Sequence, residues 1–307
     1  MTKNTPDNYR QILRDASRSE NTRLAYNKSW QWFDKWCRLN EIHAINANAE
    51  DVTNFLIEMA NNNLTLNTLK LCRSGLNDKW RRNGFHSPAS DKSVDDVLRG
   101  LARIRGDRPR RVKAIREYQL SLMLGTCKKN IYGLRDAAIL SLGFAAALRR
   151  SELCGLLIDD LDRKSNDRMT VCIRQSKTDK QSKGQKIAII DGKNIKPIER
   201  VDNWLKASRI TDGFVFQTFL QGGKLSGTPL DHGEVAKVVK RYVARIGLNP
   251  KDYSGHSLRA GFVTSAAAHH ARIDKIMEIT RHRNAETLMK YIRDENSFSD
   301  HAGELFL

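Results

Sequence analysis

Apolar residues in the first third of the chain recur at steps of three and four, the spacing of one face of a helix. The pattern predicts helices that start near Ser19, Asn48, Thr65 and Ser93, and Asn61-Asn-Asn63 ends the second one. Polar residues that can cap a helix N-terminus open these runs. Residues 1–106 are therefore predicted to form an all-helical domain. Its apolar stripes, expected to be ordinary core, contain Leu24, Trp30, Phe33, Trp36, Val52, Phe55, Leu56, Met59, Val94, Val97, Leu98 and Leu101.

Residues 116–307 mix the helical period with strict alternation. Residues 134–148 are almost unbroken in apolar and small side chains, which predicts a buried helix. Residues 169–175 and 185–190 alternate on either side of a polar turn and predict a β-hairpin, with Gly213–Phe216 as a further short strand. Asp159-Asp160 fits a solvated helix end. The predicted fold class is mainly α with a small antiparallel β-sheet (α+β), and residues 107–115 form a basic linker between the two domains.

The charge balance narrows the possible partners. The 307 residues contain 53 Lys and Arg against 35 Asp and Glu, a formal net charge of +18. Such an excess favours a polyanionic partner, nucleic acid first. A membrane surface is the alternative, but no apolar run approaches the roughly 18 residues that span a bilayer. The N-terminus lacks an apolar signal region, so we expect a cytoplasmic protein associated with nucleoid, plasmid or phage DNA.

Basic residues concentrate around the linker, where Arg99 to Lys113 contains seven of them against a single Asp107, and Pro109 interrupts the run. A charge run is often only solvated surface, but one this one-sided at a domain junction favours phosphate contacts. The candidate DNA-binding residues are Lys70, Arg73, Arg81, Arg82, Arg103, Arg105, Arg108, Arg110, Arg111, Lys113, Lys237, Lys240 and Arg241.

Metal and nucleotide sites find little support in the sequence. The five cysteines are scattered without metal-ligand spacing, so we expect reduced and mostly buried thiols. His269 and His270 are neighbours, and adjacent residues on a helix diverge by about 100°. Gly222-Gly-Lys lacks the frame of a phosphate-binding loop. We therefore expect neither a metal ion nor a cofactor.

The candidate chemistry lies near the C-terminal end. If His256 and Arg259 open a helix, they share one face and reach a single small anion. Asn284 is a plausible N-cap for a helix that brings Tyr291 back beside His282. Arg149, directly after the buried helix, is one turn from Glu152, and the pair is either an internal ion pair or part of the same anion site.

These residue types suit phosphoryl transfer without a metal. Two arginines can bind the two non-bridging oxygens of a phosphodiester, and imidazoles add hydrogen bonds. Tyr291 is then the nucleophile, and Lys177, at the turn of the hairpin, is placed to protonate the leaving oxygen.

The ordered set Leu148-Arg149-Arg-Ser-Glu152, Lys177, Gly255-His256-Ser-Leu-Arg259, and His282 with Tyr291 resembles the tyrosine recombinases of the phage integrase family. Trp30 to Asn40 and Tyr291-Ile-Arg look most like the Cre branch of that family. The resemblance implies that Arg149, His256 and Arg259 bind the scissile phosphate and that Lys177 is the general acid. It also implies that His282 fills the family's His or Trp position, that Glu152 is the supporting acid, and that Tyr291 forms a 3′-phosphotyrosyl link.

The family further implies a core-binding and a catalytic domain that form a C-shaped clamp on double-stranded DNA. It implies a monomer in solution, a homotetramer on paired inverted-repeat sites, and exchange through a Holliday junction without a cofactor. A type IB topoisomerase and a catalytically silent DNA-binding protein remain as alternatives. Many members have Leu-Gly before the second histidine, where this chain has Thr280-Arg281. Target sequence, direction of exchange, order of strand exchange, accessory proteins and host or mobile-element origin are not encoded in these patterns.

Overall fold

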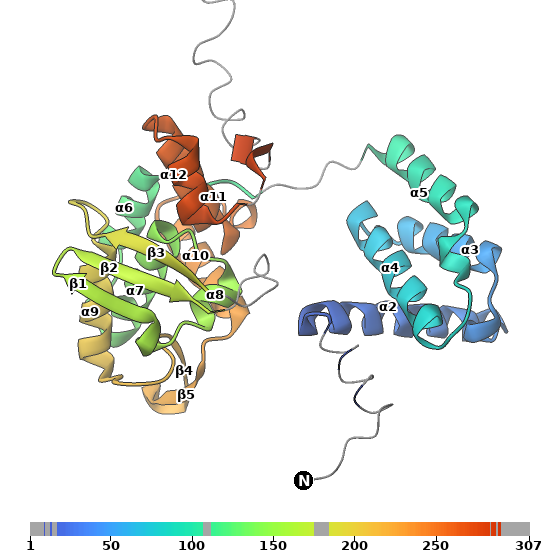
Figure 1. Cartoon of the computed structure of the whole chain (residues 1–307), viewed down its shortest axis with the longest axis horizontal. Helices are drawn as coiled ribbons and strands as arrows, with labels where there is room; N and C mark the ends of the chain where they lie inside the picture. The colour runs from blue at the N-terminus through green and yellow to red at the C-terminus, as the bar shows by residue number, and fades with distance from the viewer. Residues whose placement is uncertain are drawn as a thin grey trace, which may run out of the picture. The chain divides into compact units, whose positions relative to one another are not determined.

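The computed structural model describes residues 9, 13, 17–106, 112–174, 184–282, 284–286 and 288–289. The chain divides into two compact units, Met1–Arg110 and Arg111–Leu307, which are described separately (Figure 1). Arg108, Arg110, Arg111, Lys177, Tyr291 and the apolar Leu305–Leu307 lie outside the described residues.

The N-terminal unit is built from helices, as its apolar period predicts. Side chains cap each long helix: Ser19, Asn48, Thr65 and Asp91 accept hydrogen bonds from the backbone amides of the first turn. Asn48 and Asp51 form a reciprocal capping box, which satisfies two amides that the helix itself leaves without partners. The elements are α2 (Glu20–Leu39), α3 (Ala49–Asn61), α4 (Leu66–Arg82) and α5 (Lys92–Arg105), with short 3-10 turns at Ala44–Asn46 and Pro88–Ser90.

Aromatic side chains fill the core of this unit. Phe33 packs edge-on against Phe55 and Trp80, with ring centroids 5.2 and 5.5 Å apart. The indole of Trp80 is buried, and its Nε1 donates to Ile45 O at 3.0 Å, so the one polar atom of that side chain is satisfied. Leu24 was expected in this core but is 59% exposed. It lies nine residues from Phe33, about half a turn around the helix, which places it on the opposite face.

The C-terminal unit combines helices with two small antiparallel sheets, which confirms the α+β prediction. The sheets are β1-β2-β3 and β4-β5. Strands β2 and β3 pair from Arg168 opposite Ile190 to Ile173 opposite Gln185, so the predicted hairpin is present. The elements are α6 (Glu117–Gly125), α7 (Ile131–Ala145), α8 (Arg150–Cys154), β1 (Leu161–Ser165), β2 (Arg168–Ile173), β3 (Gln185–Ile190), α9 (Pro197–Ser208), β4 (Gln217–Phe219), β5 (Leu225–Pro229), α10 (His232–Arg245), α11 (His256–Ala268) and α12 (Ile273–Thr280).

Two local expectations were wrong. Asp160 is buried rather than solvated, because its carboxylate accepts from Leu157 N and pairs with Arg174 where the chain enters β1. The ion pair between Asp160 and Arg174 lies at the start of β1, a strand that the alternation of apolar and polar residues did not predict. The strand expected at Gly213–Phe216 starts only at Gln217, and Phe214 makes one isolated bridge to Leu157.

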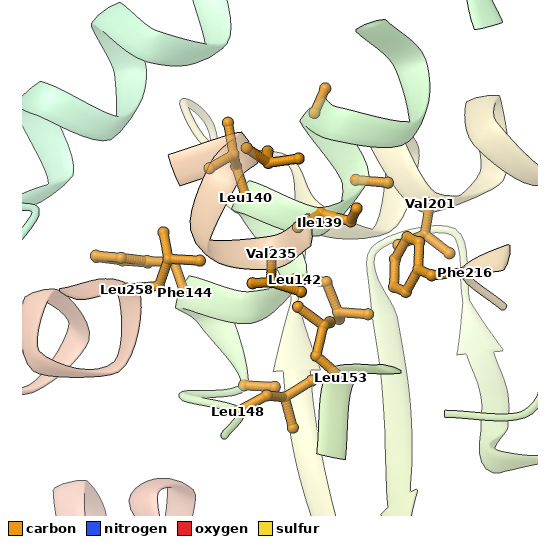
Figure 2. Packing of buried hydrophobic residues seen from close by; sticks show 14 of the residues in the cluster. Ile139, Leu140, Leu142, Phe144, Leu148, Leu153, Val201, Phe216, Val235 and Leu258 are labelled. Atoms are coloured by element: carbon orange, nitrogen blue, oxygen red, sulfur yellow. The ribbon is translucent and has the colours of Figure 1, made fainter. Parts of the chain in front are cut away.

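Helix α7 is the centre of the C-terminal unit and is buried along most of its length, as predicted (Figure 2). Its side chains pack against Leu153 of α8, Val201 of α9 and Leu258 of α11 (Figure 2). A Cβ at Gly261 would lie 1.8 Å from the carbonyl oxygen of Ile115, so only glycine permits this close approach. The chain before α6 is thereby held against α11, the helix that carries His256 and Arg259.

Candidate active site

Arg149 and Glu152 open helix α8 and are held to each other. The carboxylate Oε2 of Glu152 accepts from the backbone N of Arg149 at 2.8 Å, and Oε1 accepts from its Nη1 at 2.7 Å. The Glu152 side chain is only 1% exposed, whereas that of Arg149 is 21% exposed. The same carboxylate therefore caps the helix and orients a guanidinium that still reaches solvent.

Arg259 is buried and joins two distant turns of the chain. Its Nη1 donates to Ala147 O at 2.7 Å, and its Nη2 donates to Thr280 O. Ala147 has a left-handed backbone with φ 46°, an unfavourable conformation for a residue with a Cβ. This strained turn after α7 gives Arg259 an acceptor, and the end of α12 gives it a second one.

His256 is the first residue of α11, one turn before Arg259, as the spacing predicted. The packing of neighbouring atoms lowers the pKa of its imidazole, and the positive charges of Arg259, Arg149 and Arg150 lower it further. As a whole residue, His256 is exposed at the surface of the unit. It is therefore a neutral imidazole near pH 7, able to accept a proton.

His282 follows α12 and lies with its Nε2 at 3.4 Å from Arg259 Nη2. The Thr280 hydroxyl donates its one proton to Ile276 O at 2.7 Å, so it accepts from His282 Nδ1 at 2.8 Å. This contact selects the tautomer with the proton on Nδ1. Burial, followed by the charges of Arg259 and Arg149, lowers the pKa of His282 to about 4.

Arg281, to which the sequence analysis gave no role, also enters this cluster. It ends α12 in the left-handed conformation with φ 59°, and its side chain is 3% exposed. Its Nη2 donates to Glu152 Oε2 at 2.9 Å and to Ala147 O at 3.2 Å. The only indication of this role in the sequence is that residue 281 is an arginine, whereas many members of the family that the chain resembles have glycine there.

The structure thus brings together Arg149, Glu152, His256, Arg259 and His282 of the predicted set. Lys177 and Tyr291 lie outside the described residues. Just before Tyr291, the Asn284 side chain accepts from Glu286 N at 2.7 Å, as expected of an N-cap, and Leu288 is fully buried with Val263 and Ile276.

The candidate DNA-binding residues fall into two groups. Four have their guanidinium held by a partner within the chain: Arg73 by Asp95, Arg82 by Asp78, Arg105 by Leu64 O, and Arg241 by the buried Asp136. The other described ones are exposed, although Lys113 contacts Asp252 and Lys237 contacts Glu234. This exposed group is Lys70, Arg81, Arg103, Lys113, Lys237 and Lys240.

Within the described residues, no group of three or more His, Cys, Asp or Glu is arranged to hold a metal ion. His269 instead lies 3.4 Å from Glu117. All five cysteines are free thiols, and three of them are buried. No described helix is long and apolar enough to cross a membrane.

The sequence of this chain is similar to a known protein family and to individual recombinases. The sequence pattern of the Phage integrase family matches residues 113–297. An integrase/recombinase XerD homolog from Selenomonas ruminantium is 31% identical over 294 residues, covering 94% of this chain and 86% of that protein. The Cre recombinase of Escherichia phage P1 is 25% identical over 321 residues, covering 95% and 91%.

Solved structures share the fold at lower identity. The XerH site-specific recombinase bound to its palindromic difH substrate matches with a TM-score of 0.62 at 18% identity, covering 85% of this chain and 73% of that one. The Tn1549 transposon integrase in complex with transposon right end DNA matches with the same TM-score and identity, covering 92% of both chains. The chain therefore belongs to the phage integrase family of tyrosine recombinases, enzymes that cleave and rejoin DNA.

Proposed function

We propose that this enzyme is a site-specific recombinase that cleaves DNA through a 3′-phosphotyrosyl link to Tyr291 and exchanges strands through a Holliday junction. The observation that carries the proposal is the convergence of Arg149, His256, Arg259 and His282. Arg259 lies 3.4 Å from His282. Burial, and after it the charges of both arginines, lowers the pKa of both imidazoles. Such a cluster of donors is suited to the charge that develops on a phosphodiester under attack.

In this mechanism, Tyr291 Oη forms a bond to phosphorus while the bond from phosphorus to the 5′ oxygen breaks. Arg149 and Arg259 bind the non-bridging oxygens. His256, neutral near pH 7, accepts the tyrosine proton, and Lys177 gives a proton to the leaving 5′ oxygen. Rejoining reverses each step with a new 5′ hydroxyl as the nucleophile. The phosphotyrosyl bond conserves the energy of the original linkage, so the cycle consumes no cofactor.

The packing of Leu288 supports the role of Tyr291. Leu288 is anchored on α11 and α12, the helices that carry Arg259 and end beside His282. The tyrosine follows three residues later in the same segment.

Replacing Tyr291 by Phe tests the proposal, because only the attacking oxygen is removed. On a nicked suicide substrate, the wild type should accumulate a covalent protein–DNA adduct on denaturing gels, and Tyr291→Phe should form none. Gel-shift affinity should stay within about twofold. An adduct in the Phe variant, or its absence in the wild type, contradicts the assignment. A supercoil-relaxation assay beside a two-site recombination assay separates a recombinase from a type IB topoisomerase and from a silent DNA-binding protein.

We further propose that four copies act together on paired inverted-repeat sites in cytoplasmic DNA, with the helical unit as the core-binding domain. An apolar cavity of about 460 Å³ on the C-terminal unit, lined in part by Phe144, Ile190, Phe262 and Ile279, suits an apolar segment of another protomer. Leu305-Phe-Leu307 is a segment of that kind. Exchange of such segments between copies closes into a ring when the rotation between them permits it.

Deleting residues 299 to 307 should leave binding to one site nearly intact, weaken cooperative binding to two sites, and abolish recombination. Ile190, which is 71% exposed at the cavity, offers the complementary change. Ile190→Glu should reproduce the deletion, whereas Leu220→Glu, at an equally apolar position that is 54% exposed, should not. Gel-shift titrations on one-site and two-site DNA measure both, and unchanged cooperativity in the deletion rules the exchange out.

A further inference from the structure

Arg281 occupies a position that disfavours it in two ways. The left-handed backbone at the end of α12 is unfavourable for a residue with a Cβ, and glycine avoids that cost. The side chain is also buried, and its Nε and Nη1 have no hydrogen-bond partner among the described residues. Buried donors without partners are costly and rare in native proteins. Helix termination alone does not account for an arginine here.

The contacts of Arg281 instead go to the groups that support the phosphate-binding arginines. Glu152 Oε2 accepts from Arg281 Nη2 and from the backbone N of Arg149, and Oε1 accepts from Arg149 Nη1. With both oxygens occupied, the carboxylate is fixed in rotation. Ala147 O accepts from both Arg281 and Arg259. One buried side chain therefore contacts the direct supports of both arginines.

We propose that Arg281 is a positioning residue for strand cleavage, which holds Glu152 and the Ala147 carbonyl so that Arg149 and Arg259 present their donors to the scissile phosphate. The inference rests on the proposed function and adds to it a residue outside the predicted catalytic set. Arg281 acts through Glu152 and is not itself expected to touch DNA.

Electrostatics gives the proposal a consequence that a purely structural role lacks. Burial alone raises the pKa of Glu152, but the charge of Arg281 and the hydrogen bonds and charge of Arg149 outweigh burial and lower it. The other charged or titratable groups described around the cluster are Arg150, Arg259, His256 and His282. Without Arg281 the pKa of Glu152 rises, and protonation then releases Arg149 at a pH where the wild type still holds it. The acid limb of the pH profile of cleavage should therefore move to higher pH.

The test compares Arg281→Gly, Arg281→Gln and Arg281→Lys in single-turnover cleavage of a nicked suicide substrate. Gly and Gln should slow adduct formation roughly 10- to 100-fold, the size of effect expected when reacting groups are slightly misplaced. Both should shift the acid limb to higher pH, because the Glu152 carboxylate loses the charge that lowers its pKa. Lys retains the charge and should recover at least part of the rate and a pH profile close to that of the wild type.

Two controls separate positioning from folding. Arg281→Gly relieves the left-handed strain, which offsets part of the stability lost with the Glu152 ion pair. Cleavage is therefore measured at a temperature where circular dichroism shows the variant to be folded, and affinity for uncleaved DNA should be unchanged. If Gly does not fold, the comparison of Gln with Lys decides the question between variants that both keep a side chain. Gln and Gly rates within about twofold of the wild type with an unmoved pH profile overturn the inference. A wild type that forms no adduct overturns the proposed function instead.

Discussion

The two units bury different kinds of polar side chain. In the described part of the N-terminal unit the buried polar residues are Ser29, Thr53 and Ser87, and none is charged. The described part of the C-terminal unit buries six charged residues, namely Arg135, Asp136, Glu152, Asp160, Arg259 and Arg281. Apolar residues of similar volume can often replace a buried ion pair without loss of stability. Stability alone therefore accounts for the buried residues of the N-terminal unit. The buried charges of the C-terminal unit call for a catalytic role as well.

The buried charges of the C-terminal unit are themselves of two kinds. Asp136 accepts from Arg135 and Arg241, and Arg135 also lies 4.8 Å from the centre of the Phe219 ring. That network has a partner for each of its ions within the chain. In the second kind, Arg149 and Arg281 share the one carboxylate of Glu152, and Arg259 joins Arg281 at Ala147 O. Arg281 leaves two nitrogens without partners in the described chain. Among the described residues, the first network has two arginines for one carboxylate and the second has three, so the second has the larger excess of positive charge and is better suited to an anion.

The largest expected effect separates these two clusters. Arg259→Met should slow adduct formation about 100- to 1000-fold, the usual result of removing a donor to a developing oxyanion. Arg135→Met should destabilise the fold by about 3–5 kcal/mol, because Asp136 loses a buried partner, but cleavage by the folded protein should change little. Single-turnover cleavage and urea unfolding of both variants measure the contrast. Equal cleavage defects would erase the distinction between a structural and a functional buried arginine.

A substitution in the aromatic core tests the role of packing in the N-terminal unit. Phe33→Ala removes a fully buried ring and should lower the free energy of unfolding of the N-terminal unit by about 3–5 kcal/mol. Four of the five tryptophans belong to this unit, so intrinsic fluorescence in urea reports chiefly on it. Phe85→Ala, at a ring that is 53% exposed, is the matched control and should stay within about 0.5 kcal/mol of the wild type. A similar loss in both variants would contradict the aromatic core.

The same contrast explains what the sequence could predict. The N-terminal helices and their caps follow from local periods and from residues such as Asn48 and Thr65, which act within one turn. The hairpin of β2 and β3 and the buried helix α7 are local in the same sense. The prediction for Leu24 was wrong because apolar residues spaced by mixed steps of three and four do not determine on which face of the helix the first of them lies.

The site was only partly predictable for the opposite reason. His256 and Arg259 are one turn apart, and Arg149 and Glu152 likewise, so spacing alone paired them. The bond of Arg259 to Ala147 O and that of Arg281 to Glu152 join segments far apart in the chain. These contacts depend on the carbonyl of Ala147, in a strained turn, and on Arg281, whose backbone is left-handed. The periodicity of apolar residues predicts neither conformation. The motif resemblance supplied the grouping, and the tertiary contacts supplied Arg281.

The smallest expected effect is an acid sensitivity that belongs to the C-terminal unit. The pKa of His282 falls from 6.5 to about 4 on folding, so the folded state disfavours its protonated form. The unfolded chain then binds more protons than the folded chain between these two values. The contribution of His282 to the free energy of unfolding is therefore greatest above pH 6.5. It declines as the pH falls towards 4 and changes little below that. The full shift corresponds to about 3 kcal/mol at 1.36 kcal/mol per unit, and partial solvent exposure reduces the expected loss to roughly 1–2 kcal/mol.

His282→Asn removes the titrating ring and isolates this effect. Urea unfolding followed by circular dichroism between pH 7.5 and pH 4.5 should show a smaller acid loss in the variant than in the wild type, and His256, whose pKa is lowered too, should account for part of the remainder. His43→Asn in the N-terminal unit is the matched control and should leave the acid loss as it is. Identical pH dependence in His282→Asn and the wild type would mean that the imidazole is protonated as easily in the folded site as in water. The arginines that surround it could not then be as close as the 3.4 Å contact with Arg259 places them, because an adjacent guanidinium in a buried site repels a second positive charge.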